Sequence, residues 1–178
     1  MHKKTFTFLV ILYPLFVIAL IFSTNVVLSI PQRNVFRVQK AQISEFDDLS
    51  NNLSYKIDTF IANQDIFYTV EFIGWAFLQD EQDTSDQQIK LIFISEENQY
   101  EVETQLQERF DLRQVFIENH ISGYKHGFIT KFSTLPMKNG IYKLYLYCYE
   151  NDNTFGMVDT GRMYVKTYRS FSAYNVNP

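Results

Sequence analysis

Residues 141–149 read Ile-Tyr-Lys-Leu-Tyr-Leu-Tyr-Cys-Tyr and decide the fold class. Aromatic and β-branched residues favour a pleated, half-buried strand. A period of two in such a run places successive side chains on opposite faces of a sheet. Turn residues stand before this stretch at 136–140 and after it at 151–154. The stretch therefore predicts one β-strand with a turn at each end.

The chain from residue 53 onward repeats this pattern of short strands and turns. The other expected strands are 53–62, 66–78, 89–94, 100–106, 128–132 and 161–168. Residues 111–118 are expected to form a short helical turn, and the sequence shows no long amphipathic helix. Seven or eight short strands separated by turns predict a mainly β domain, an antiparallel, Ig-like β-sandwich. A small closed barrel is the alternative.

The first 30 residues predict a transmembrane helix. Residues 5–30 contain no formally charged residue and are rich in Leu, Ile, Val and Phe. These 26 residues would form a helix of about 39 Å, longer than the roughly 30 Å hydrocarbon core. A secretory signal peptide usually has an apolar region of only about 7–15 residues, whereas the uninterrupted run here is 6–22. The alternative is a signal cleaved near Ser29, which would release a secreted, soluble module.

Four parts of the chain follow from this pattern. They are an N-terminal transmembrane anchor at 1–30, a tether at 31–52, the β-sandwich at 53–168 and a loose tail at 169–178. Basic residues lie on both sides of the apolar run, so the positive-inside rule gives no clear asymmetry. A short N-terminal tail with Lys3 and Lys4 before a long folded domain favours a cytoplasmic N-terminus. The expected topology is a single-pass signal-anchor with the sandwich at the cell surface.

Charge restricts the partners of the domain. The chain has a formal net charge of −4, and beyond Lys3 and Lys4 there are 14 basic and 20 acidic residues, a net −6. Nucleic-acid binding depends on neutralising phosphates, so an acidic domain without a basic run excludes nucleic acid. Anionic lipid headgroups would repel the domain weakly.

Several short motifs resemble a known family. Gly74-Trp75-Ala76-Phe77 is followed by Arg109-Phe110-Asp111-Leu112, then by Gly127-Phe128 and Asn139-Gly140-Ile141-Tyr142. This order resembles the GWA-type β-sandwich modules of bacterial glycosyltransferases and cell-envelope polysaccharide proteins, over residues 66–168. Leu112 stands where these modules usually have Val, and the sequence contains no transferase domain. The resemblance implies a sandwich fold and a connection with cell-envelope polysaccharide.

The same motif residues have direct structural interpretations. Gly74 would let another segment of backbone pass close by, and the indole of Trp75 is expected in the centre of the sandwich. Arg109 and Asp111 could form a charge-assisted hydrogen bond that fixes the crossing into the helical turn. Asn139-Gly140 is typical of a turn.

Ligand-binding residues are harder to choose because each motif residue also has a structural role. If a sugar is bound, an exposed aromatic side chain is as suitable a platform as the tryptophan. The candidate ligand-binding residues are Trp75, Arg109, Asp111, Tyr100 and Tyr124. The expected partners are the membrane and either a cell-envelope glycan or a membrane protein.

The sequence shows no constellation typical of an enzyme: no nucleophile elbow, no phosphate-binding Gly-rich loop and no Cys–His pair. Cys148 is the only cysteine and is expected to be buried. His120 and His126 fit no metal-binding spacing and are expected to be exposed in a loop. The carboxylates of 80–83 and Glu96–Glu97 are expected to be solvated in turns, with glycoside hydrolysis as a minor alternative. We predict no catalytic residue, metal or cofactor.

Overall fold

The computed structural model describes residues 35–41, 53–63, 65, 67–78, 87–118, 125–150 and 154–174. These residues form two β-sheets and little helix, which confirms the prediction of a mainly β domain. The predicted anchor at 1–30 lies outside them. Within these ranges, no helix is both long enough and apolar enough to cross a membrane.

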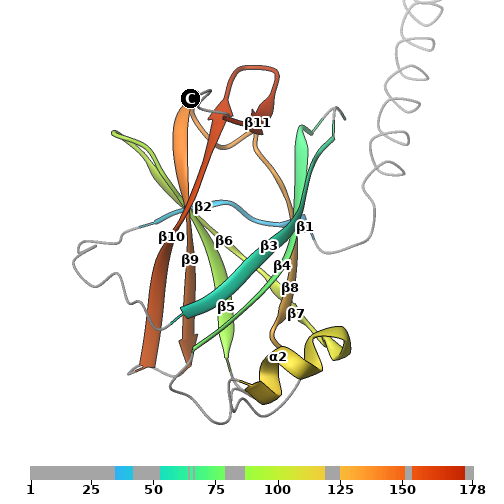
Figure 1. The fold of residues 1–178 in the computed structure, drawn as a ribbon. Helices are drawn as coiled ribbons and strands as arrows, with labels where there is room; N and C mark the ends of the chain where they lie inside the picture. Colours follow the sequence, from blue (N-terminus) through green and yellow to red (C-terminus); the bar gives the residue numbers. More distant parts are fainter. Residues whose placement is uncertain are drawn as a thin grey trace, which may run out of the picture. The chain divides into compact units, whose positions relative to one another are not determined.

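One sheet has five strands (Figure 1). In spatial order it contains β1 (Val35–Phe36), β8 (Gly127–Ser133), β4 (Thr69–Leu78) and β3 (Leu53–Ala62), and β7 (Gln105–Gln107) also pairs with β8. Neighbours are antiparallel except β1 and β8, which are parallel. β4 therefore has a strand on each side, and its residues on both faces are buried or half-buried.

The other sheet has six strands, all antiparallel to their neighbours. In spatial order it contains β11 (Phe171–Ala173), β10 (Thr154–Lys166), β9 (Gly140–Glu150), β5 (Gln88–Ile94), β6 (Gln99–Glu103) and β2 (Gln39–Lys40). The stretch at 141–149 forms most of β9, which pairs with β10 on one side and with β5 on the other.

The described residues contain more strands than the seven or eight expected. The additional ones, β1, β2, β7 and β11, have only two or three residues each. β1 and β2 lie within the predicted tether, and β11 lies within the predicted tail. Two or three residues cannot show an alternating pattern, so these strands form through pairing with longer strands rather than through a pattern of their own.

Two strands continue from one sheet into the other. β6 and β7 are separated only by Thr104, whose Oγ1 donates a hydrogen bond to the carbonyl of Ile89 at 2.8 Å. On the other sheet, Oγ1 of Thr130 donates to the carbonyl of Glu103 at 2.9 Å. β1 and β2 make the same transfer through residues 37–38. The expected strand at 100–106 is therefore two strands in different sheets.

The core lies between the sheets and is rich in aromatic rings. Phe72 of β4 contacts Tyr164 of β10 at a centroid distance of 5.3 Å and Phe93 of β5 at 5.9 Å. Cys148 is 0% exposed in this core, as predicted, and burial raises the pKa of its thiol. One continuous cluster with side chains from both sheets gives a β-sandwich-like domain.

The turn before β9 is held by a buried tyrosine. The hydroxyl of Tyr142 donates to the carbonyl of Lys138 at 2.8 Å, and the Lys138 amide donates to the hydroxyl of Tyr100 at 3.2 Å. Burial, together with the nearby Tyr100, raises the pKa of Tyr142 to about 12. The Tyr142 hydroxyl therefore remains a neutral hydrogen-bond donor at physiological pH.

Candidate functional site

Arg109 is the centre of the most extensive ion-pair cluster described for this chain. Its Nε and Nη2 donate to the two carboxylate oxygens of Asp111, both at 2.8 Å. Its Nη1 donates to Oδ2 of Asp58 at 2.7 Å. The predicted Arg109–Asp111 bond is confirmed, and it is bidentate, the geometry in which a guanidinium binds a carboxylate best. Asp58 is an additional partner that the sequence pattern did not indicate. These three residues are called the arginine clamp below.

A shift in strand register brings Asp58 to Arg109. Ile57 pairs with Gly74 and Thr59 pairs with Ile73, so Asp58 has no opposite residue on β4. Such a bulge changes the face to which the following side chains point. A strict period of two through the strand at 53–62 would keep residues 55, 57, 59 and 61 on one face, and the bulge at Asp58 breaks this alternation. Phe60 packs against the core instead, and Ile61 is 44% exposed.

Gly74 is required opposite the bulge. A Cβ atom at this position would lie 2.3 Å from the carbonyl oxygen of Lys56 and 2.7 Å from the ring of Phe128. Both distances are far below van der Waals contact, so no larger residue fits without moving the backbone. The prediction that Gly74 allows a close approach of another backbone is confirmed.

Gly127 holds the aliphatic part of Arg109. A Cβ atom on Gly127 would lie 2.4 Å from Cγ of Arg109 and 2.9 Å from the carbonyl oxygen of Gln107. The arginine side chain therefore lies directly against the backbone of β8. The Gly-Trp, Arg-x-Asp and Gly-Phe motifs, far apart in sequence, meet in one packed unit.

The arginine clamp shifts the pKa values of two of its three members. The side chains of Arg109 and Asp58 are 18% and 24% exposed, and that of Asp111 is 61% exposed. Hydrogen bonds to Asp111 and Asp58 raise the pKa of Arg109, although desolvation opposes them. The hydrogen bond from Arg109 lowers the pKa of Asp111. Both groups are thus charged near neutrality, which is unfavourable for proton transfer at that pH.

Trp75 is not in the centre of the sandwich, and that prediction is wrong. It stacks on Phe77 at a centroid distance of 5.6 Å and an interplanar angle of 15°. Both belong to a cluster separate from the core, which is completed by Leu112, Val115 and Phe116. These three residues come from η1 (Phe110–Leu112) and α2 (Arg113–Glu118), which confirm the predicted helical turn.

The position of Trp75 follows from the phase of β4. Phe72 and Ala76 face the core, so the odd-numbered Trp75 and Phe77 must face the opposite side of the sheet. Apolar residues occupy both phases of this strand, and the sequence alone could not choose between them. Nε1 of Trp75 is buried and has no hydrogen-bond partner among the described residues. The indole acts as packing surface beneath the helical segment.

The prediction that His126 is exposed in a loop is also wrong, because its side chain is 0% exposed. Its ring packs edge-on against Phe116 at 4.5 Å and lies 5.6 Å from Phe77. His126 is therefore part of the layer between β4 and α2. His120 lies outside the described residues.

Neither tyrosine candidate is established as an exposed platform. Tyr100 is 3% exposed and packs against Tyr142 at 5.9 Å, so its expected exposure is wrong. The sequence of the strand at 100–106 does not show which of its side chains face the other sheet, so the burial of Tyr100 could not be predicted from it. Tyr124 lies outside the described residues.

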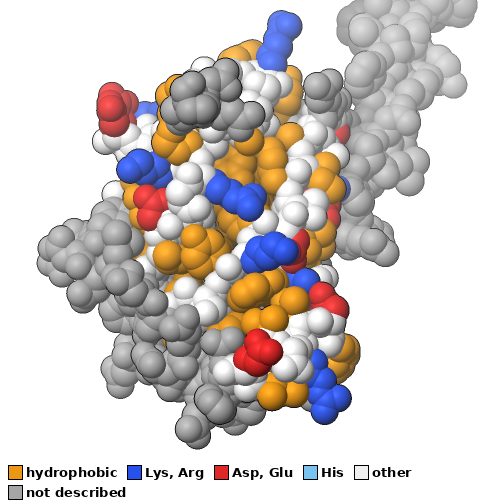
Figure 2. Space-filling view, in the orientation of Figure 1, with side chains coloured by type: hydrophobic (Ala, Val, Ile, Leu, Met, Phe, Trp, Pro, Cys, Tyr) orange, Lys and Arg blue, Asp and Glu red, His pale blue; other side chains and the backbone are white. Residues whose placement is uncertain are grey.

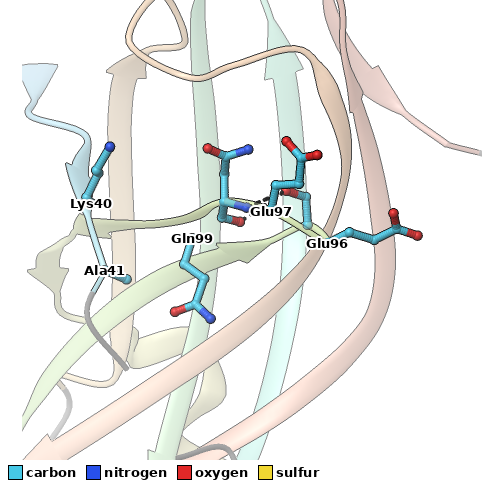
Figure 3. A pocket seen from close by; sticks show the side chains of 7 residues that line it. Lys40, Ala41, Glu96, Glu97 and Gln99 are labelled. Atoms are coloured by element: carbon cyan, nitrogen blue, oxygen red, sulfur yellow. Dashed lines mark hydrogen bonds between the residues drawn. The ribbon is translucent and has the colours of Figure 1, made fainter. Parts of the chain in front are cut away.

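A polar hollow of about 270 Å³ lies beside the β5–β6 turn. It is lined by Lys40, Ala41, Ser95, Glu96, Glu97, Asn98 and Gln99 (Figure 3). Glu96 and Glu97 are exposed and point in different directions, so their carboxylates do not converge on one point. This confirms the interpretation of Glu96–Glu97 as solvated turn residues; the acidic residues at 80–83 lie outside the described chain. Among described side chains, no three His, Cys, Asp or Glu residues group as metal ligands would.

Comparisons with protein-family models, curated proteins and solved structures found no match to this chain. What can be proposed for its function therefore depends on its own residues.

Proposed function

We propose that this protein is a single-pass membrane protein whose extracytoplasmic sandwich acts without catalysis, as a binding or assembly module in cell-envelope polysaccharide processes. The observation that carries the proposal is the uncharged run at 5–30, which is followed after only four residues by the first sandwich strand at Val35. Such a run is long enough to span a bilayer.

The contacts of the motif residues support a binding or assembly role over catalysis. Gly74, Arg109, Asp111 and Gly127 are engaged in fixing β3, β4 and β8 to the helical segment. The motif resemblance supports the proposal that this domain has the fold of cell-envelope sandwich modules. The proposed link to polysaccharide rests on the same resemblance. A glycan contact would have to use other side chains.

We further assign the sandwich to the Ig-like class. Apart from the short strands β1, β2 and β11, one sheet consists of β3, β4, β8 and β7, and the other consists of β10, β9, β5 and β6. This is the strand arrangement of Ig-like domains with four strands in each sheet. Tyr142, near the start of β9, bonds to the carbonyl four residues upstream, as the tyrosine corner of such domains does.

Topology and processing test the proposal together. Full-length protein with a C-terminal tag is expressed, protease is added to intact cells, and the purified product is weighed by intact mass spectrometry. The proposal predicts an accessible tag and full mass. A fully protected tag would overturn the outward topology. Loss of about the first 29 residues would identify a cleaved secretory signal and a secreted module.

A structural subunit of a membrane complex is the second candidate function. It is favoured by the helical segment, where Phe110 is 60% and Ile117 is 55% exposed. Exposed apolar side chains close together are typical of protein contacts. Affinity isolation from detergent should then yield a stoichiometric protein partner, lost in Phe110→Ser/Ile117→Ser and kept in the neighbouring control Arg113→Ser. Retention of the protein on glycan surfaces, with no protein partner, would favour the first proposal.

A further inference from the structure

The helical segment covers only part of the outer face of the five-stranded sheet. Phe116 of α2 packs on Phe77, near one end of β4, at a centroid distance of 5.7 Å. The other end of this face lies around Ile73. No described helix or strand packs on it. The outer face is therefore raised at one end and open at the other.

The open end is apolar and carries one acidic and one basic side chain. Its residues alternate with core residues along their strands, so their side chains point away from the core. Strand register places Ile73 beside Ile129, and Glu71 between Ile61 and Lys131. Ile61 is 44% exposed, and the other four side chains are half-buried. These five residues are called the open half below.

The helical segment presents a second apolar surface. Phe116 is 1% exposed and faces the sheet, whereas the next residue, Ile117, is 55% exposed. Glu118 follows it and is also exposed, with its carboxylate accepting a hydrogen bond from Nε2 of Gln114 at 3.0 Å. Figure 2 shows hydrophobic side chains at the surface where Figure 1 places α2, next to acidic and basic side chains. Such a group marks a contact surface.

The open half has room for one more helical segment. Ile73 and Phe77 are four residues apart on β4, a distance of about 13 Å along the strand. Packed helices lie about 8–10 Å apart. A second helical segment therefore fits on the open half beside the first. A half-turn about an axis parallel to the cross-strand rows brings two copies face to face, with the helical segment of each on the open half of the other.

The area of this contact is in the range of stable dimers. Four strands lie side by side in the sheet and β4 has ten residues, so the face measures roughly 19 Å by 33 Å. Two such faces bury about 1,250 Å² together, and specific protein interfaces bury about 1,200–2,000 Å². The contact would cover Ile61 and Ile117, which are both exposed in a single copy.

Charge is also complementary in this arrangement. The end of α2 lies on the β8 side of the sheet, because Phe116 packs against His126, which directly precedes β8. The half-turn keeps this side over β8 of the partner, where Lys131 lies. In the described part of the chain Lys131 makes no salt bridge, although Glu71 is opposite it. Glu118 of one copy is therefore placed to pair with Lys131 of the partner subunit, and this pair occurs twice.

We propose that the chain forms a symmetric dimer in which the helical segment of each copy packs on the open half of the other. The inference rests on the second candidate function and names the partner of the helical segment as a second copy of this chain. Ile117 packs against Ile73 of the partner subunit and Ile129 of the partner subunit, and the two Glu118–Lys131 pairs lie at the rim. A second copy is favoured over an unrelated protein because one chain carries both halves of the contact.

Charge exchange between copies tests the dimer. Full-length protein is purified in detergent and its association is measured by analytical ultracentrifugation. Glu118→Lys and Lys131→Glu should each weaken dimerisation about tenfold, since each places two pairs of like charges in the contact. An equimolar mixture of the two variants should form heterodimers of wild-type strength, because both pairs are then restored. Lys143→Glu, on the outer face of the other sheet, is the control and should leave the dimer unchanged. Circular dichroism checks that each variant is folded.

Cysteine cross-linking locates the contact. Chains with Glu71→Cys and chains with Ile117→Cys, carrying different tags, should be joined by a short bismaleimide, because the two positions lie on opposite sides of the contact. Neither should be joined to Lys143→Cys. Native Cys148 does not compete for the reagent because it is 0% exposed.

The outcomes separate the dimer from the function on which it rests. A monomeric wild-type chain, or a dimer that the charge variants leave unchanged, would overturn the proposal. So would a monomer in which Glu71→Cys is protected from maleimide, since another segment of the same chain would then cover the open half. If the monomer still isolates a stoichiometric protein of different sequence, the dimer is wrong and the second candidate function stands. If it isolates none, both are wrong.

Discussion

The two faces of the five-stranded sheet are packed in different ways. The inner face meets the whole second sheet through a continuous aromatic core around Phe72. The outer face is covered at one place by the helical segment, where Phe77 and Phe116 form a small cluster. Only Phe77, Phe116 and His126 are fully buried in this outer layer, so the layer has little redundancy and depends on the arginine clamp and on two glycines. The difference shows that the fold is set by the core, while the position of the helical segment is set by a few specific contacts.

The largest expected effect on stability comes from replacing one buried phenylalanine on each face of the five-stranded sheet by alanine. Phe72→Ala should lower the free energy of unfolding by about 3–5 kcal/mol, since it leaves a cavity in the main core. Phe116→Ala should cost less because the small cluster can collapse or open locally. Chemical denaturation gives both values. Hydrogen exchange should show global loss of protection for Phe72→Ala and loss confined to 110–118 and its neighbours for Phe116→Ala. Equal, global effects would contradict the comparison.

The next effect tests the close approach at the bulge. Gly74→Ala should destabilise the domain by about 1–3 kcal/mol, because the new methyl group collides with the backbone of β3. Gly140→Ala is the matched control, since its Cβ would meet only the Tyr142 ring at 3.6 Å, an ordinary contact. Thermal unfolding of both variants measures the difference. A stable Gly74→Ala protein would show that the bulge can relax.

Removal of the clamp should have a smaller effect. Arg109→Gln should lower stability by about 1–2 kcal/mol, because it removes a bidentate pair with the exposed Asp111 and a pair with Asp58 whose two side chains are only 18% and 24% exposed. Arg109→Lys should restore little, because an ammonium group lacks the planar fork that binds both oxygens of Asp111. Arg113→Gln provides the control from the same segment. Full rescue by lysine would mean that charge alone, without bidentate geometry, holds the segment.

The smallest expected effect is a change with pH in the stability that the Arg109–Asp111 bond contributes. Because the hydrogen bond from Arg109 holds the pKa of Asp111 below its ordinary value in the folded chain, this bond stabilises the fold above the unfolded pKa. This contribution is lost as the pH falls through the folded pKa. The stability difference between wild type and Arg109→Gln should therefore be constant near neutrality and shrink below about pH 4. Urea unfolding at a series of pH values measures it, and a difference that stayed constant throughout the acid range would contradict the role of Asp111.

The strands and the glycine at position 74 were predictable because each has a local cause. The run at 141–149 alternates strictly, and a glycine beside a tryptophan in a strand indicates close packing. The bulge at Asp58 was not predictable, because a shift of one residue changes no composition and reverses the phase of everything after it. Trp75 and His126 were misplaced for a related reason: their burial comes from a helical segment that packs on the outside of a sheet. The apolar residues on both phases of β4 indicate that both faces are covered, but they do not show which face meets the second sheet.

The passage of chain between the sheets has a mechanical consequence. Both crossings, at Thr104 and at residues 37–38, lie along the same edge of the sandwich. At the opposite edge β3 and β10 are joined by hydrogen bonds, from Arg162 Nη2 to the carbonyl of Ile57 at 2.9 Å and from the Tyr55 hydroxyl to the carbonyl of Asp159 at 3.5 Å. A tensile load that separates the sheets would stretch peptide bonds at one edge and only hydrogen bonds at the other. The domain should therefore open from the β3–β10 edge, with the crossings as a covalent hinge.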